Sequence, residues 1–146
     1  MAKIVAVCTS EKAGEKKHDI GCGLLKEDFG LEGDAHSKAG WHRQLSLLST
    51  SSIEKMRKLG IEVGPGDFAE NLTVDGPELV LYELPIGQRI KVGSDILLEV
   101  TQIGKECHSH CEIFKQVGKC VMPHEGIFTR VIKGGEVKTG DDVVLV

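Results

Sequence analysis

The sequence contains few aromatic residues, no long apolar run and no block of basic residues. Only four Phe, one Trp and one Tyr occur among its 146 residues. The apolar run near its start, residues 4–8, is shorter than a signal-peptide core and far shorter than the ~20 residues of a membrane-spanning helix. With 18 basic and 22 acidic residues the formal net charge is −4, whereas electrostatic binding to nucleic acid or anionic lipid needs clustered Lys and Arg. We therefore expect a cytoplasmic protein that binds neither nucleic acid nor membranes.

Several motifs of catalysis and nucleotide binding are also missing. The sequence has no Walker loop, no nucleophile-elbow serine and no His-Glu-x-x-His, and residues 21–23 lack the third glycine of a dinucleotide fingerprint. It has no internal repeat and no linker. A chain of this length can bury roughly 70% of the surface that it exposes when unfolded. We expect a single globular domain over residues 1–146.

Most apolar residues alternate with polar ones at a spacing of two, which is typical of strands with one buried face. Glycine, with 18 copies, is spread along the chain, and several copies lie in turns between these segments. The segments expected to form strands are 4–7, 45–47, 68–74, 90–92, 96–100, 127–132 and 143–146. Many short strands at this spacing favour a mostly β fold with a few short helices, arranged as an antiparallel barrel or sandwich.

Two Ser-x-x-Glu sequences, at 51–54 and 109–112, predict helices that begin with a capping box. Gly60 and Gly118 are placed to end these helices. Cys107 would then lie two residues before the N-cap of the second helix, close to its N-terminus.

The cysteines give the first indication of chemistry. The chain has five of them, and in a reducing compartment they should be thiols. Near a helix N-terminus, unpaired backbone N–H groups and the macrodipole favour thiolate, the form that attacks electrophiles and ligates metals. Cys107 is therefore the candidate catalytic residue and the candidate metal ligand. The alternative interpretation is a small buried cysteine at the end of a strand.

The same region offers a second interpretation as a zinc site. Cys107, Cys111, Cys120 and His124 have the spacing Cys-x3-Cys-x8-Cys-x3-His, which contains enough ligands for a tetrahedral centre. The usual Cys-x2-Cys knuckle is missing, and in the predicted helix Cys111 would lie beside Phe114 and face the core. Zinc is therefore the less favoured cofactor, and a zinc-stabilised binding module without catalysis is an alternative function.

A glycine-rich segment at residues 30–36 is a candidate anion site. Its glycines permit close approach of the backbone to a ligand, and Asp34, His36 and Arg43 supply an acceptor, a titratable donor and a permanent cation. This set suits a phosphate-like ligand. The alternative is a glycine turn with a solvated histidine and an arginine paired to a carboxylate.

Glu70 and Asn71 stand next to each other in the expected strand 68–74. Adjacent strand positions face opposite sides of a sheet, so at least one of these side chains points inward, where a polar group needs a partner. That partner is either a ligand or the backbone of a turn.

Four segments in a fixed order carry a family resemblance. They are GLEGDAHSKAGWHRQLSLLS, then GDFAENLTVDG, then LPIGQRIKVG with LLEVTQIGKEC, and finally EGIFTRVIKGGEVKTGDDV. Over nearly the whole chain they resemble the MOSC family, the domain found at the C-terminus of molybdenum cofactor sulfurases and as small stand-alone bacterial proteins. The resemblance implies a MOSC-type β-barrel and a functional cysteine after the strand that here ends at Ile103, a position that Cys107 occupies.

The resemblance also implies a ligand and the residues that bind it. In the family the cysteine is proposed to carry sulfur for a metal–sulfur centre, or to coordinate molybdenum in enzymes that hold the pterin cofactor (molybdopterin). The positions that match the walls of the cofactor pocket are Asp34, His36, Arg43, Glu70, Asn71 and Arg130. Of these, Arg43 and Arg130 would hold phosphate, and Asn71 would hydrogen-bond the pterin.

The resemblance further implies partners. The sulfurases have a separate pyridoxal-phosphate domain that generates the sulfur, for which 146 residues leave no room. We expect the chain to bind the anionic pterin cofactor and to depend on a sulfur-donating desulfurase or a cofactor-synthesis enzyme. A further alternative is an accessory domain that docks onto such an enzyme without chemistry of its own.

Overall fold

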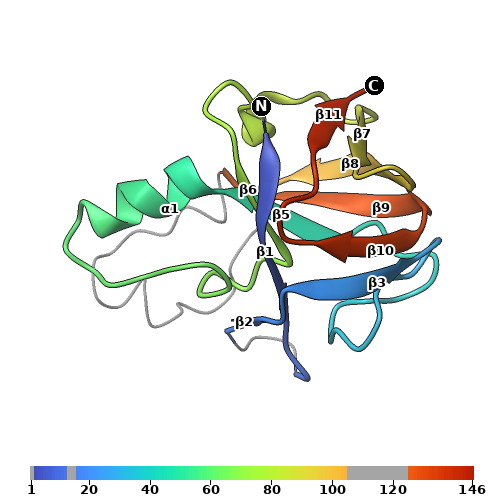
Figure 1. The fold of residues 1–146 in the computed structure, drawn as a ribbon, viewed down its shortest axis with the longest axis horizontal. Helices are drawn as coiled ribbons and strands as arrows, with labels where there is room; N and C mark the ends of the chain where they lie inside the picture. Colours follow the sequence, from blue (N-terminus) through green and yellow to red (C-terminus); the bar gives the residue numbers. More distant parts are fainter. Residues whose placement is uncertain (1, 13–15, 105–124) are drawn as a thin grey trace.

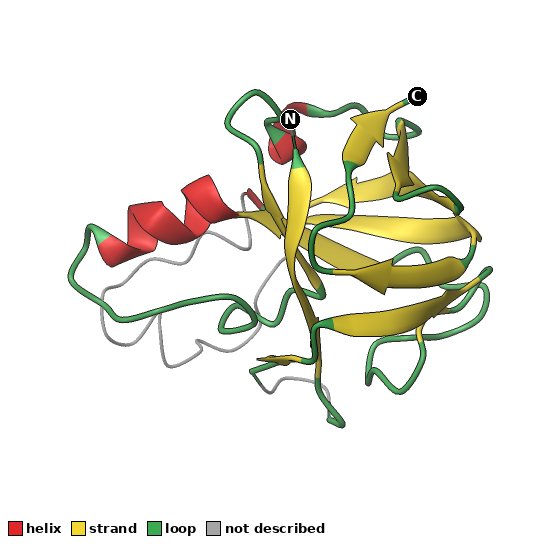
Figure 2. Ribbon diagram, in the orientation of Figure 1, coloured by secondary structure: helices red, strands yellow, loops and turns green. Residues whose placement is uncertain are grey.

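The computed structural model describes residues 2–12, 16–104 and 125–146, and strands predominate in them (Figures 1 and 2). The larger sheet has eight strands in the order β11-β7-β8-β9-β5-β6-β1-β2, and the smaller sheet has three in the order β10-β3-β4. The strands of the larger sheet are β1 (Lys3–Thr9), β2 (His18–Asp19), β5 (Leu45–Ser49), β6 (Leu72–Asp75), β7 (Arg89–Val92), β8 (Ile96–Ile103), β9 (Ile127–Lys133) and β11 (Val143–Leu145). The strands of the smaller sheet are β3 (Cys22–Lys26), β4 (Gly30–Leu31) and β10 (Gly135–Lys138). The predicted mostly β class is confirmed.

The larger sheet curls until its two edges approach each other. Its described strands pair antiparallel except for β5 and β6, which are parallel and are joined through helix α1 (Thr50–Arg57). A short 3-10 helix, η1 (Leu81–Glu83), follows β6. At the far edges, a bridge between Lys3 and Asp142 links β1 to the residue before β11. Backbone hydrogen bonds from Ile4 N–H to the Asp141 carbonyl oxygen at 2.9 Å and from Gly140 N–H to the Ile4 carbonyl oxygen at 2.7 Å join the same two segments. The sheet is therefore barrel-like in its course.

The main hydrophobic core lies between the two sheets. The larger sheet contributes residues such as Ile4, Leu47, Leu98 and Val131, and the smaller sheet contributes Leu25, Leu31 and Val137. A second cluster packs α1 against the sheet through Leu48, Ile53, Met56, Val63, Phe68 and Phe128. Strand β5 contributes to both clusters and is buried along its whole length. The expectation that only one face of β5 is buried is therefore wrong. Its second face, which carries Ser46 and Leu48, is covered by the α1 cluster.

Helix α1 begins two residues earlier than the sequence predicts. Its N-cap is Ser49, whose side chain accepts a hydrogen bond from the Ser52 N–H at 3.3 Å, so Ser51 is not the cap. The helix ends at Arg57, and Gly60, with φ +95°, follows the C-cap by two residues. The second predicted helix, 109–118, lies outside the described residues. No helix in the described part of the chain is both long enough and apolar enough to span a bilayer.

The strand expected at 68–74 begins only at Leu72. Ala69 has a φ of +63°, which no residue of a regular strand adopts, and residues 65–68 form a turn instead. The side chain of Phe68 is buried in the α1 cluster. Glu70 and Asn71 therefore lie in the loop that leads into β6, and both are buried.

Candidate functional site

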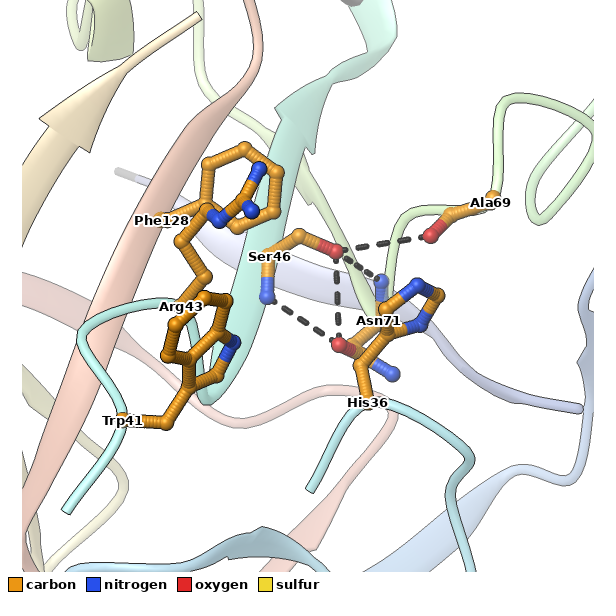
Figure 3. Close-up of a pocket in the computed structure, with 7 residues that line it drawn as sticks. All are labelled: His36, Trp41, Arg43, Ser46, Ala69, Asn71 and Phe128. Atoms are coloured by element: carbon orange, nitrogen blue, oxygen red, sulfur yellow. Dashed lines mark hydrogen bonds between the residues drawn. The ribbon is translucent and has the colours of Figure 1, made fainter. Parts of the chain in front are cut away.

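A cavity of about 120 Å³ lies between two loops and the central strands of the larger sheet (Figure 3). It is lined by Ser46 on β5 and Phe128 on β9, by His36, Trp41 and Arg43 of the loop between β4 and β5, and by Ala69 and Asn71 of the loop before β6. Ser46 and Phe128 are opposite each other in the register of β5 and β9, which places both side chains on one face of the sheet. The structure thus brings together three of the residues predicted to bind a ligand, namely His36, Arg43 and Asn71.

Arg43 is held between two aromatic rings. Its guanidinium carbon lies 5.0 Å from the centre of the Trp41 ring and 5.6 Å from the centre of the Phe128 ring, within the range of cation–π attraction. Its Nε atom is buried and has no hydrogen-bond partner among the described residues, and no described carboxylate forms an ion pair with Arg43. The arginine is therefore fixed in orientation by its neighbours while its charge and donor capacity stay available to an anion.

Asn71 ties together the strands beneath the cavity. Its Oδ1 atom accepts hydrogen bonds from the Ser46 N–H at 3.0 Å and the Ser46 hydroxyl at 3.3 Å. Its Nδ2 atom donates to the carbonyl oxygen of Cys8 on β1 at 3.1 Å. Because the carboxamide can donate two hydrogens, only one remains for a ligand. Asn71 thus acts first as a structural link from β5 to β1, a role that the sequence did not reveal.

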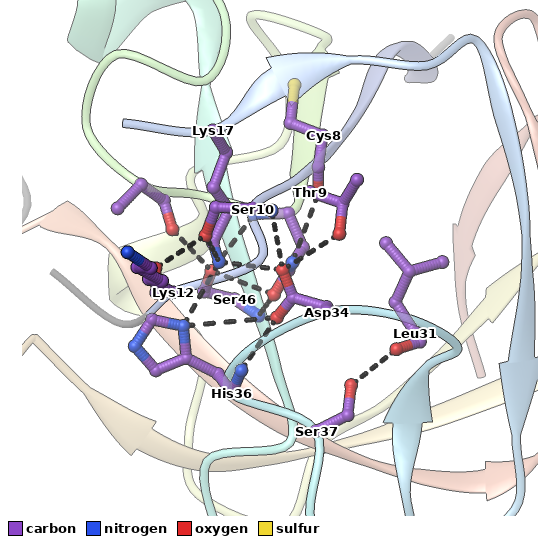
Figure 4. A network of polar contacts seen from close by, with 12 residues as sticks. Cys8, Thr9, Ser10, Lys12, Lys17, Leu31, Asp34, His36, Ser37 and Ser46 are labelled. Carbon is purple, nitrogen blue, oxygen red and sulfur yellow. Dashed lines mark hydrogen bonds and ion pairs between the residues drawn. The ribbon is translucent and has the colours of Figure 1, made fainter. Parts of the chain in front are cut away.

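Asp34 belongs to a buried polar network next to the cavity (Figure 4). Its Oδ1 atom accepts hydrogen bonds from the Lys17 ammonium at 2.7 Å, the Thr9 hydroxyl at 3.1 Å and the Ser10 N–H at 3.2 Å. Its Oδ2 atom accepts the backbone N–H of His36 at 3.1 Å. Asp34 does not itself line the cavity but fixes the start of the loop that carries His36.

The side chains of Lys17 and Asp34 form an ion pair that is completely removed from solvent. Burial raises the pKa of the Asp34 carboxyl, but the hydrogen bond and charge of Lys17, with the N–H groups of His36 and Ser10, outweigh it, so the pKa lies below its usual range. The Lys17 ammonium also contacts Nδ1 of His36 at 3.1 Å. Lys17 therefore connects the buried network to the cavity through His36. Its burial could not be predicted, because the residues around it in the sequence do not distinguish it from a surface lysine.

Glu70 is fully buried but is not among the residues that line the cavity. Its Oε2 atom accepts the Thr73 hydroxyl at 2.8 Å, whereas Oε1 has no partner of normal hydrogen-bond geometry in the described part of the chain. Burial raises the pKa of this carboxyl, although the Thr73 hydroxyl and nearby backbone N–H groups act in the opposite direction. The prediction that at least one of the two adjacent polar residues points inward is confirmed, since both Glu70 and Asn71 are buried.

Arg130 is also separate from the cavity. It lies on β9 opposite Glu99 of β8, and its Nη2 atom is 3.3 Å from Oδ1 of Asp28. The same oxygen accepts a hydrogen bond from Gln44 at 2.9 Å, which is the main reason that the pKa of Asp28 lies below its usual range. The Nε atom of Arg130, like that of Arg43, is buried without a hydrogen-bond partner in the described part of the chain. The two arginines predicted to hold phosphate differ in that Arg130 has a carboxylate partner and does not line the cavity.

The cysteines predicted to carry chemistry lie outside the described residues. Cys107, together with Cys111, Cys120 and His124 of the zinc interpretation, falls in residues 105–124, so both predictions stay predictions. Among the described residues, no group of three His, Cys, Asp or Glu side chains is arranged to hold a metal ion. Cys8 is fully buried, and desolvation, helped by the Glu70 carboxylate, raises the pKa of its thiol to about 12, which makes it unreactive.

Comparisons with known proteins agree with the resemblance inferred from the motifs. The model of the MOSC domain family matches residues 34–144. The fold is similar to that of the YuaD protein of Bacillus subtilis, with 20% identity and a TM-score of 0.77 over 98% of this chain and 94% of that one. It is also similar to YiiM of Geobacillus stearothermophilus (17% identity, TM-score 0.71, 100% of this chain and 75% of that one). For YiiM of Escherichia coli the identity is 24% and the TM-score 0.67, over 100% of this chain and 70% of that one. A search of curated protein sequences finds no match.

Proposed function

We propose that this chain, which belongs to the MOSC domain family, binds the molybdenum cofactor or a related metal–sulfur species through the cavity around Arg43. The observation that carries the proposal is the state of Arg43. Its guanidinium is fixed between Trp41 and Phe128, and its buried Nε lacks a hydrogen-bond partner within the described residues. A buried donor without a partner costs free energy, and an anionic ligand that accepts its hydrogen bond removes that cost.

The residues of the cavity fit the phosphate end of such a cofactor. Arg43 supplies planar N–H donors, and no described carboxylate lines the cavity to repel an anion. The rings of Trp41 and Phe128 exclude water, which strengthens an ion pair formed between them. The volume of about 120 Å³ is well below the ~300–1,000 Å³ of pockets that enclose whole small ligands, so the described residues hold one end of the cofactor.

We further propose that Cys107 is the thiolate that ligates the metal or carries sulfur. The support comes from its predicted position at a helix start and from how its segment is attached. Strand β8 ends at Ile103, which pairs with Ile127 at the start of β9, and the Gly104 N–H donates to the Gly126 carbonyl oxygen at 2.6 Å. The described residues on either side of 105–124, Gly104 and Gly126, therefore lie close to Phe128 of the cavity. Thiolate is a soft ligand, and the bound cofactor would supply the redox and sulfur-transfer chemistry at its metal.

Reconstitution with purified cofactor tests this proposal. The molybdenum and pterin retained after desalting are measured for wild type, Arg43→Ala and Cys107→Ser. We expect Arg43→Ala to bind about 10- to 100-fold more weakly, since a hydrogen bond to a charged group is worth ~1.5–3 kcal/mol, and Cys107→Ser to lose molybdenum. Arg89→Ala is the matched control, because Arg89 lies on β7, pairs with Glu99 at 3.7 Å and does not line the cavity.

Equal retention by the wild type and all three variants would overturn the proposal. Metal analysis of the same wild-type protein addresses the alternative module. Stoichiometric zinc that is lost together with the fold on chelation would favour zinc stabilisation over cofactor binding.

We also propose that the sulfur comes from a separate desulfurase. A thiolate acceptor takes sulfur from a donor persulfide by attack on its outer sulfur, which leaves the donor as a thiol. Incubation with a cysteine desulfurase and cysteine should therefore add the mass of one sulfur atom to the peptide that contains Cys107. The same increase in Cys107→Ser would show that another cysteine is the acceptor.

A further inference from the structure

We propose that the backbone carbonyl of Ala69 accepts a hydrogen bond from the ligand of the cavity. The site then selects an oxyanion that still carries a proton, such as hydrogenphosphate, over one that carries none, such as sulfate. This ligand class rests on the proposed function, because the same cavity holds the anionic group.

The backbone of Ala69 is held in an unusual conformation beside the cavity. Its φ of +63° lies in the left-handed region, which residues with a side chain rarely adopt. The Ala69 N–H donates to the Gly66 carbonyl oxygen at 3.0 Å. Two residues later, the Asn71 N–H donates to Ser46, with 3.1 Å to its carbonyl oxygen and 3.0 Å to its hydroxyl. These bonds fix the chain on both sides of the peptide group between residues 69 and 70.

This peptide group has its donor and its acceptor on opposite sides. In a planar trans peptide, the N–H and C=O groups point in opposite directions. The N–H of Glu70 acts on the buried Glu70 carboxyl, where it opposes the rise in pKa that burial causes. The Ala69 carbonyl oxygen points toward Ser46 at the cavity (Figure 3). The donor therefore serves the protein interior, and the acceptor is left to the cavity.

The acceptor capacity of the Ala69 carbonyl is largely unused. The Ser46 hydroxyl oxygen lies 3.5 Å from it, at the long limit of a hydrogen bond. The single hydrogen of this hydroxyl has a nearer acceptor in Asn71 Oδ1 at 3.3 Å. Because a carbonyl oxygen has two lone pairs, at least one of them stays without a donor from the described residues. A ligand that lacks a donor would leave it unpaired.

Arg43 supplies the opposite polarity from the other side of the cavity (Figure 3). Its guanidinium, between Trp41 and Phe128, carries a positive charge and only donates. A ligand that reaches both Arg43 and Ala69 must therefore accept at one end and donate at the other. Hydrogenphosphate does both, and a phosphate monoester does so when singly protonated. Sulfate would place an oxygen against the carbonyl lone pairs with no hydrogen between them.

Two dianions of the same shape test this selectivity. Trp41 is the single tryptophan of the chain and lines the cavity, so its fluorescence reports binding. At about pH 8.5, above the second pKa of phosphate, hydrogenphosphate and sulfate carry the same charge and differ by one proton. We expect hydrogenphosphate to bind about tenfold more tightly or better, and hydrogenarsenate to exceed selenate likewise. Equal affinities within each pair would overturn the proposal and leave the proposed function intact.

The Ala69 carbonyl can be observed on its own by NMR. The dipeptide Ala-Glu occurs once in the sequence, at residues 69–70. Cell-free synthesis with ¹³C at the alanine carbonyl carbon and ¹⁵N in glutamate therefore gives one carbonyl–amide correlation. We expect its ¹³C resonance to move downfield when hydrogenphosphate binds, as it does when a carbonyl accepts a hydrogen bond, and to move less with sulfate. Binding of hydrogenphosphate that leaves this resonance in place would overturn the proposal.

Two substitutions of Ala69 test the part played by its backbone. Glycine adopts positive φ freely, so Ala69→Gly should keep the preference for hydrogenphosphate within about threefold of the wild type. Valine disfavours this region, so in Ala69→Val the preference should fall to about threefold or less while sulfate still binds. An unchanged preference in Ala69→Val would contradict the proposal. If Ala69→Val does not fold, the wild-type affinities and the carbonyl resonance decide.

Arg43→Ala separates this proposal from the proposed function. We expect it to weaken the binding of both dianions, since each needs the guanidinium. If neither dianion binds the wild type, or if Arg43→Ala binds both as well as the wild type does, the cavity is not an anion site. That result would refute the proposed function and the selectivity together.

Discussion

Three side-chain atoms, Arg43 Nε, Arg130 Nε and Glu70 Oε1, are buried without hydrogen-bond partners in the described part of the chain, and the surroundings of Arg43 and Glu70 differ most. Arg43 borders a cavity between two aromatic rings, where an incoming anion can accept its hydrogen bonds. Glu70 is 0% exposed and does not line the cavity, and protonation removes the charge that burial disfavours. The arginine is therefore suited to a ligand, and the glutamate is suited to a neutral structural role.

The titration of Glu70 predicts a loss of stability as the pH rises. Burial raises the pKa of its carboxyl above the ordinary 4.5, so the folded protein keeps a proton that the unfolded chain has released. Its stabilising contribution is then fully present below pH 4.5 and is lost as the pH rises toward the folded-state pKa. In Glu70→Gln, which cannot ionise, we expect a smaller decrease in the free energy of unfolding between pH 4.5 and neutral pH. Urea unfolding at several pH values measures this, and parallel profiles for the two proteins would contradict it.

At the scale of elements, the sequence predicts best where one face of a strand is exposed. Strand β7 alternates between exposed and buried residues, and β8 alternates between buried and half-buried residues from Ile96 to Thr101, as the sequence predicts. Strand β5 is covered on both faces, and such coverage depends on packing partners far away in the sequence. The glycines at 64–66 predicted a turn, but its continuation to Ala69, whose φ is +63°, was missed, because Phe68 is buried in the α1 cluster by contacts distant in the sequence.

The observed N-cap of α1 can be distinguished from the predicted one by mutation. Ser49→Ala removes the acceptor of the Ser52 N–H, and we expect a loss of about 1 kcal/mol in the free energy of unfolding. Ser51→Ala, at the exposed position that the capping-box prediction favoured, should change stability by less than about 0.5 kcal/mol. Urea unfolding of both variants checks this, and a larger loss for Ser51→Ala would restore the predicted cap.

The close contact between Gly66 and the Lys17 backbone leads us to predict different costs for alanine at two glycines. Gly60 and Gly66 both have positive φ, but a Cβ at Gly60 would meet open space whereas a Cβ at Gly66 would overlap the Lys17 backbone. We expect Gly60→Ala to cost about 1–2 kcal/mol from backbone conformation alone. Gly66→Ala should cost about 1–3 kcal/mol more because of the overlap. Equal costs in thermal or urea unfolding would show that the contact is not tight.

For the whole molecule, the sequence predicted the fold class, the family and part of the site. Motif order identified the MOSC family, and three of the residues predicted to bind a ligand, His36, Arg43 and Asn71, line one cavity. Their role in binding stays a prediction. The sequence could not predict that Trp41 and Phe128 hold Arg43, because Phe128 comes from a strand far from the other two residues in the chain. Nor could it predict the burial of Lys17, whose partners are assembled by tertiary contacts. The role of Cys107 stays a prediction.

The central claim, that the Arg43 cavity holds the anionic end of the cofactor, is tested most directly by native mass spectrometry. The protein is isolated from cells with intact molybdenum cofactor synthesis, as wild type and as Arg43→Ala. We predict an added mass of the pterin cofactor on the wild type and at least a tenfold smaller fraction on Arg43→Ala, with Arg89→Ala equal to the wild type. A wild type without bound pterin, or an equal fraction on all three proteins, would contradict the account.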